Sequence, residues 1–226
     1  MKRTVILFIL ASMYIFSSCK NKETKEASDT LIAKDDNSVE MMSVNSLNSE
    51  KLSIDTEKSS VFWRGSMLFS FGEHYGTVNF KSGYLLKNGD KLSGGLFVVD
   101  MNTIVNTDGD YSADLVDHLK NEDFFDVPKY PEAILEFTEI EYVDINRYKI
   151  DAHLTIKGIK KPIVLFNVDF IDNTSKLFDE KPSKMSVKFK IDRTDWNINY
   201  ASKGISAAKD YAISDAIELE VEVYLK

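Results

Sequence analysis

The stretch AIELEVEVYLK, residues 216–226, decides the fold class of this chain. Apolar side chains occupy every second position from Ile217 to Leu225, and glutamates fill the positions between Ile217 and Val223. A helix would spread these acids around its circumference, whereas a strand places successive side chains on opposite faces. The stretch therefore predicts a strand with one apolar face and one face in water.

The same alternation recurs along most of the chain, for example in KMSVKFKID (184–192) and RYKIDAHLTIKG (147–158). Such runs predict about eight strands, near residues 60–68, 75–87, 92–104, 133–143, 147–157, 162–172, 184–193 and 215–226. One segment, SADLVDHLKN, has helical spacing, and Ser112 is its predicted N-cap. Many antiparallel strands with one helix predict an all-β domain that closes into a barrel or packs as a sandwich.

Three strands contain irregularities. In ILEFTEIEYV the apolar parity shifts between Phe137 and Ile140, which predicts a bulge. In PIVLFNVDF both parities are apolar at the start, so Leu165 and Phe166 compete for the inward side. The pair Gly94–Gly95 predicts a bend.

The first 50 residues differ in texture from the rest. MKRTVILFILASMYIFSSCK has a basic start, an apolar run from Thr4 to Phe16 and then Cys19, the one cysteine in the chain. It resembles a bacterial lipoprotein signal, which implies that residues 1–18 are removed and that Cys19 is acylated, for example with palmitate. An ordinary secretory signal and a retained membrane anchor are the alternatives.

Residues 20–50 carry no aromatic residue, glycine or proline and are rich in polar side chains, so residues 19–50 are predicted to form the lipidated cysteine and a flexible tether. Residues 51–226 would then be the folded domain. Lys20 stands where some lipoproteins carry an inner-membrane retention aspartate, and by that resemblance we expect a cell-envelope protein on the outer membrane.

Composition and motifs exclude several functions. The formal net charge is −8, which argues against nucleic acid as a partner. Asp108 opens a calcium-like run, but Ala113 stands where the loop needs glycine and Leu119 where it needs glutamate. The three histidines lack metal-ligand spacing, and no nucleophile elbow or phosphate-binding glycine loop is present. We therefore expect no catalytic residue, metal or cofactor.

Several segments together resemble one family. These segments are VFWRG (61–65), DHLKNEDFFDVPKYP (117–131), HLTIKGIKKPIVL (153–165), FKIDRTDW (189–196) and ISDAIELEVEVYL (213–225). In this order they resemble the YceI-like family. The resemblance implies a single eight-stranded, antiparallel, lipocalin-like barrel whose apolar lumen binds amphiphilic molecules with long hydrocarbon tails, such as polyisoprenoids or isoprenoid quinones. It also implies an exported protein that is not an enzyme.

The apolar faces of the strands supply the candidate ligand-binding residues of the lumen. They are Trp63, Val78, Phe80, Leu96, Val98, Leu135, Phe137, Leu154, Ile156, Phe166, Val168, Val187, Phe189 and Val221. The alternative is that these side chains fill a solid core, because a barrel of eight strands is narrow enough to be packed shut.

Two further groups would lie at a barrel end. Leu115, Leu119, Phe124 and Phe125 are predicted to turn inward as a cap. Arg193 is predicted to pair with a carboxylate such as Asp215 and tie the barrel end, or alternatively to contact a ligand headgroup through its planar fork.

The resulting hypothesis is a lipid-anchored protein that carries, stores or sequesters a hydrophobic lipid in its barrel. One alternative is a redox or enzymatic protein acting on quinone-like lipids, which would need convergent polar groups in the lumen. Another is a scaffold lipoprotein that binds a protein partner through its acidic exterior.

Overall fold

The computed structural model describes residues 49–68, 72–109, 112–173, 182–202 and 212–226. The predicted signal peptide, Cys19 and nearly all of the tether lie outside these residues. The elements are β1 (Glu50–Ser53), β2 (Ser60–Met67), β3 (Glu73–Asn88), β4 (Lys91–Asn106), α2 (Ser112–Lys120), β5 (Glu132–Asp144), β6 (Arg147–Ile156), β7 (Ile159–Ile171), β8 (Lys184–Asp192), the 3₁₀ turn η1 (Arg193–Trp196) and β9 (Ile213–Tyr224).

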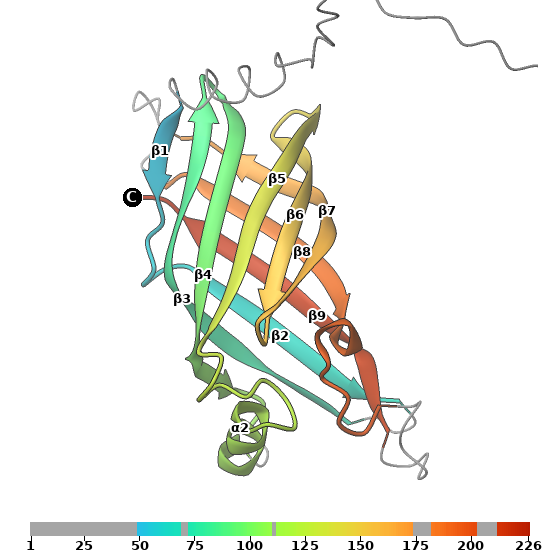
Figure 1. Ribbon diagram of the computed structural model, residues 1–226. Helices are drawn as coiled ribbons and strands as arrows, with labels where there is room; N and C mark the ends of the chain where they lie inside the picture. Colours follow the sequence, from blue (N-terminus) through green and yellow to red (C-terminus); the bar gives the residue numbers. More distant parts are fainter. Residues whose placement is uncertain (1–48, 69–71, 110–111, 174–181, 203–211) are drawn as a thin grey trace, which may run out of the picture. The chain divides into compact units, whose positions relative to one another are not determined.

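Eight of the strands form a closed antiparallel barrel, as predicted (Figure 1). The hydrogen-bonded order runs β3-β2-β9-β8-β7-β6-β5-β4, and the pairing of β3 with β4 closes the ring. Helix α2 lies at the end of the barrel where β4 ends and β5 begins (Figure 1). The barrel class and the single helix in the described part of the chain are thus confirmed.

The short strand β1 was not predicted. It pairs with residues 84–87 of β3, which β2 leaves free because β2 pairs with β3 only over residues 73–79. One strand edge of β3 is therefore shared by two successive segments. Four residues with a single buried side chain, Leu52, are too short a run to show alternation in the sequence.

The acids of the 216–226 stretch do face water, and they pair with lysines of the neighbouring strand. Ion pairs join Lys184 to Glu222, Lys188 to Glu220 at 2.8 Å, and Lys190 to Glu218 at 2.6 Å. The opposite faces of β8 and β9 bury Val187 against Val221. Exposed pairs of this kind contribute little stability each, about 0–1 kcal/mol, so burial of the apolar face holds the two strands together.

The hairpin between β6 and β7 turns through two residues of positive φ, Lys157 at 51° and Gly158 at 72°. Two such residues in succession are typical of the tight turn that matches the twist of a hairpin. Tyr130 packs against this turn, and a Cβ atom on Gly158 would lie 2.8 Å from Tyr130 Cε1. Glycine is therefore required here for both backbone conformation and space.

Candidate ligand-binding cavity

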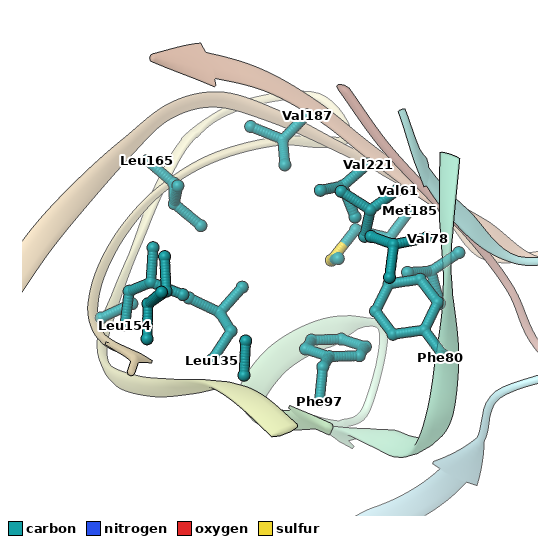
Figure 2. Close-up of a cluster of buried hydrophobic side chains, with 14 of the residues drawn as sticks. Val61, Val78, Phe80, Phe97, Leu135, Leu154, Leu165, Met185, Val187 and Val221 are labelled. Carbon is teal, nitrogen blue, oxygen red and sulfur yellow. The ribbon is translucent and has the colours of Figure 1, made fainter. Parts of the chain in front are cut away.

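The barrel interior contains a cavity of about 190 Å³ in the half nearest α2. Figure 2 shows side chains of the barrel wall, including Val61, Val78, Phe97 and Leu135, pointing toward the interior. Side chains from every strand of the barrel except β7 line the cavity, together with α2, the loop after it and η1. Nearly all of the lining side chains are apolar.

The other half of the interior is solid. Its side chains are at most 1% exposed and none of them lines the cavity: Leu85, Ile150, Leu165, Val168, Phe170, Met185 and Val223. This close packing accounts for the alternative of a filled core. The two hypotheses from sequence therefore each describe one half of the barrel.

Most of the predicted lumen residues lie inside the barrel. Eight of them line the cavity: Trp63, Val78, Phe80, Leu135, Leu154, Ile156, Phe189 and Val221. Val168 and Val187 are buried away from the cavity, and Phe137 is partly buried with its ring 5.6 Å from that of Phe97. The bulge predicted between Phe137 and Ile140 is confirmed, because the register shifts between Phe137 and Glu139.

The placement of Leu96 and Val98 in the lumen was wrong. Their neighbour Phe97 is 1% exposed and lines the cavity instead. All four residues of the segment LFVV are apolar, so alternation alone cannot show which of them face the lumen. The choice depends on space across the sheet, because Gly83 leaves room for the ring: a Cβ there would lie 2.8 Å from Phe97 Cδ1.

The placement of Phe166 in the lumen was also wrong, since this side chain is 60% exposed and Leu165 is fully buried. The register between β6 and β7 shifts here, and Asn167 has a φ of 54°. This bulge inserts an extra residue between Leu165 and Val168, which are both inward. Regular alternation counted back from the inward Val168 therefore places Phe166 inward, although its side chain faces outward.

The predicted cap residues Leu115, Leu119, Phe124 and Phe125 all line the α2 end of the cavity. A main-chain hydrogen bond from Phe125 N to Leu119 O, 3.1 Å long, folds the loop back onto the helix. Lys157 Nζ donates to Glu122 O at 2.8 Å and joins the loop to the β6–β7 turn. The cap is thus fixed by backbone contacts as well as by apolar packing.

An aromatic cluster lies against the cap. The rings of His118 and Phe124 are 5.0 Å apart, and Tyr200, which follows η1, lies 4.5 Å from His118 and 5.4 Å from Phe124. The His118 Nε2 atom is 3.2 Å from Asp123 Oδ2. These contacts connect α2 with the segment between η1 and β9.

Arg193 is 1% exposed and lines the cavity, but its guanidinium is turned toward main-chain oxygens. It donates to Ile198 O at 2.7 Å and Ser214 O at 3.1 Å, and its Nη2 lies 3.5 Å from Asp215 Oδ1. Burial lowers the pKa of Arg193, and the charge of Asp215 opposes that shift. This geometry is that of the predicted tie between η1 and β9; contact with a headgroup stays a prediction.

Other polar groups gather where β3 begins. His74 Nδ1 is 2.8 Å from Asp108 Oδ2. Asp108 also accepts a hydrogen bond from the backbone N–H of Tyr75. Glu73 pairs with Arg64 at 3.3 Å. Within the described ranges no cluster of three or more His, Cys, Asp or Glu side chains is arranged to hold a metal ion. Asp108 thus holds the start of β3 and the end of β4 together.

None of the described helices is long and apolar enough to span a membrane.

The closed barrel is lipocalin-like, and its apolar cavity is compatible with a hydrophobic ligand. A family model described as the YceI-like domain matches residues 52–225, and the chain belongs to this family. UPF0312 protein plu2095 of Photorhabdus laumondii is 38% identical over 48 residues, which are 21% of this chain and 24% of that protein. In this match the chain spans about a quarter of the relative's length.

Two solved structures resemble this chain, and one of them supports the same architecture. The crystal structure of Burkholderia cenocepacia BcnA matches with a TM-score of 0.59 at 19% identity, covering 76% of this chain and 99% of that one. A Campylobacter jejuni YceI protein matches with a TM-score of 0.48 at 22% identity, covering 66% of this chain and 84% of that one. At these identities the likeness to BcnA concerns the fold.

Proposed function

We propose that this protein binds a long-chain hydrophobic ligand, of polyisoprenoid or isoprenoid-quinone type, in the cavity of its barrel. The observation that carries the proposal is the cavity of about 190 Å³ lined by apolar side chains. An apolar cavity of about 150 Å³ accepts a benzene ring in another protein. The cavity here is therefore wide enough for a ring or a short stretch of hydrocarbon.

Affinity would come from burial, because each CH₂ group removed from water contributes about 0.8 kcal/mol. A slender chain suits this barrel, since an eight-stranded barrel leaves room for one small ligand at most. A longer tail would extend past the cap or displace flexible lining side chains such as Met101. The solid half of the barrel limits how far the tail reaches inward.

The apolar lining favours binding over chemistry. An enzyme acting on quinone-like lipids would need ionisable groups converging on the cavity. Among the lining residues that the structure describes, the ionisable side chains are Glu73, His74 and Arg193, and each is engaged with a charged side chain of the protein. We infer carriage, storage or sequestration of the ligand.

We further propose that acyl chains on Cys19 hold the barrel at the outer membrane, with residues 20–50 as the tether. The support is the lipoprotein-like N-terminal sequence. Labelling growing cells with a radioactive or clickable palmitate should mark the wild-type protein, and Cys19→Ser should abolish the label. A labelled Cys19→Ser protein would contradict this anchor.

Ligand binding is tested by extracting the purified protein with organic solvent and analysing the extract by mass spectrometry. We expect a long-chain lipid in an amount comparable to that of the protein. Ala133→Leu, which enlarges a side chain of the cavity wall, is the matched variant and should carry much less lipid while remaining folded. An extract of folded wild-type protein without lipid would overturn the proposal.

A further inference from the structure

The indole N–H of Trp63 is a buried donor that no protein group in the described part of the chain accepts. Trp63 is 8% exposed and lines the cavity. The other tryptophan of the chain, Trp196, is 1% exposed and donates from Nε1 to Leu154 O at 3.2 Å. Buried indole N–H groups usually have a partner, so Trp63 departs from the rule that Trp196 follows.

The surroundings of Trp63 explain why the protein provides no acceptor. Its cross-strand neighbours are Gly76 on β3 and Leu219 on β9, and neither carries a side-chain oxygen. The adjacent inward residue, Val61, and its partners Val78 and Val221 are also apolar. Leaving a donor unpaired in such surroundings is costly, because its hydrogen bond to water is not replaced.

We propose that the ligand supplies the missing partner: a neutral oxygen, such as a carbonyl or ether group, accepts a hydrogen bond from Trp63 Nε1. This inference rests on the proposed function and narrows its ligand from any polyisoprenoid-type lipid to one that places an uncharged oxygen acceptor inside the barrel. The oxygen would lie within the barrel among the apolar side chains of the wall. It would fix the depth at which the chain is held.

The acceptor should be neutral because the described residues that line the cavity offer no uncommitted positive charge. The cationic side chain that lines it, Arg193, donates to main-chain oxygens and pairs with Asp215. His74 lies against the carboxylate of Asp108. Arg64, whose partner Glu73 lines the cavity, is likewise committed to that carboxylate at 3.3 Å. A phosphate or carboxylate beside Trp63 would lose its hydration without a counter-ion.

The test compares three probes on the purified full-length chain after its bound lipid has been removed. They are an isoprenoid ketone such as geranylacetone, the hydrocarbon of matched length, and an isoprenoid phosphate. Isothermal titration with the wild type should show the ketone binding about fivefold tighter than the hydrocarbon, the gain typical of one neutral hydrogen bond. The phosphate should bind more weakly than the ketone.

Trp63→Phe keeps an aromatic ring but removes the donor. Because the phenyl ring is smaller than the indole, we expect somewhat weaker binding of both uncharged probes, and, beyond that, loss of the preference for the ketone over the hydrocarbon. Phe80→Leu is the matched control on the same cavity wall, and it should weaken both uncharged probes while preserving their ratio.

A second readout uses the unmodified protein. With two tryptophans in the chain, the ¹⁵N–¹H spectrum contains two indole signals. The ketone should move the Trp63 signal more than the hydrocarbon does, and it should leave the Trp196 signal in place because that N–H already has a partner. This measurement stands even if Trp63→Phe folds poorly.

The outcomes separate this inference from the proposed function. Equal affinities for ketone and hydrocarbon, with equal shifts of the Trp63 signal, would overturn the acceptor and leave lipid binding intact. If the phosphate binds more tightly than the other two probes, the inference that the acceptor is neutral is wrong. If no probe binds, the proposed function fails and the inference fails with it.

Discussion

Lys87 Nζ lies 2.8 Å from Asp172 Oδ2, although 85 residues separate the two in the sequence. Lys87 is buried on β3, and Asp172 follows β7 at the solid end of the barrel. Glu50 of β1 lies 3.3 Å from the same Nζ atom. One buried ammonium group thus joins three parts of the chain at the end opposite to α2.

Asp172→Asn should destabilise the barrel by about 2 kcal/mol, because it leaves a buried charge with a poorer partner. Urea unfolding followed by circular dichroism measures the change. The matched control is Glu136→Gln, which breaks an exposed pair with Lys160 at 2.7 Å and should cost less than about 1 kcal/mol. Equal losses in the two variants would show that Lys87 does not hold this end.

The same pair predicts a loss of stability at alkaline pH. The hydrogen bond to Asp172 raises the pKa of Lys87 above its usual value. Its contribution is complete below the pKa of an unfolded lysine, about 10.4, and is lost as the pH rises through the higher folded-state pKa. The difference in unfolding free energy between wild type and Lys87→Met should therefore shrink above about pH 10.5. A difference that is independent of pH would contradict this account.

The aromatic cap predicts a loss of both stability and ligand retention. Phe124→Ala removes a buried ring from the cavity end and should cost about 2–4 kcal/mol. Phe166→Ala is the control, because that ring is 60% exposed and its removal should change stability by less than about 0.5 kcal/mol. Thermal unfolding and lipid content are measured together. If Phe124→Ala keeps full stability but loses lipid, the cap acts as a gate rather than as a structural closure.

Local patterns predicted the strands well, because alternation and turn residues act over a few positions. The run 216–226 and its partner 184–192 form β9 and β8 with the expected faces in water. The family resemblance correctly predicted the closed barrel. Alternation alone could not distinguish a barrel from a sandwich. The pairing of β3 with β4 closes the ring, and no single segment of sequence encodes that pairing.

Alternation in the sequence predicted the wrong inward side chain where both faces of a strand are apolar. Phe97 rather than Leu96 turns inward because Gly83 makes room across the sheet. Leu165 rather than Phe166 turns inward because a bulge at Asn167 resets the alternation. Both causes lie in neighbouring strands or in backbone conformation, so the apolar pattern of one strand cannot reveal them. The unpartnered N–H of Trp63 is likewise a property of the assembled wall.

Enlarging an alanine should have opposite effects in the two halves of the barrel. Ala133 lines the cavity, so Ala133→Leu fills empty space and should stabilise the fold by about 0.5–2 kcal/mol. Ala152 is 2% exposed and does not line the cavity, so Ala152→Leu forces extra atoms into close packing and should cost about 1–3 kcal/mol. Urea unfolding of lipid-free protein compares the two variants with the wild type. The opposite signs follow because packing density, not hydrophobicity, differs between the sites. Losses of similar size in both variants would show that the barrel has no open half.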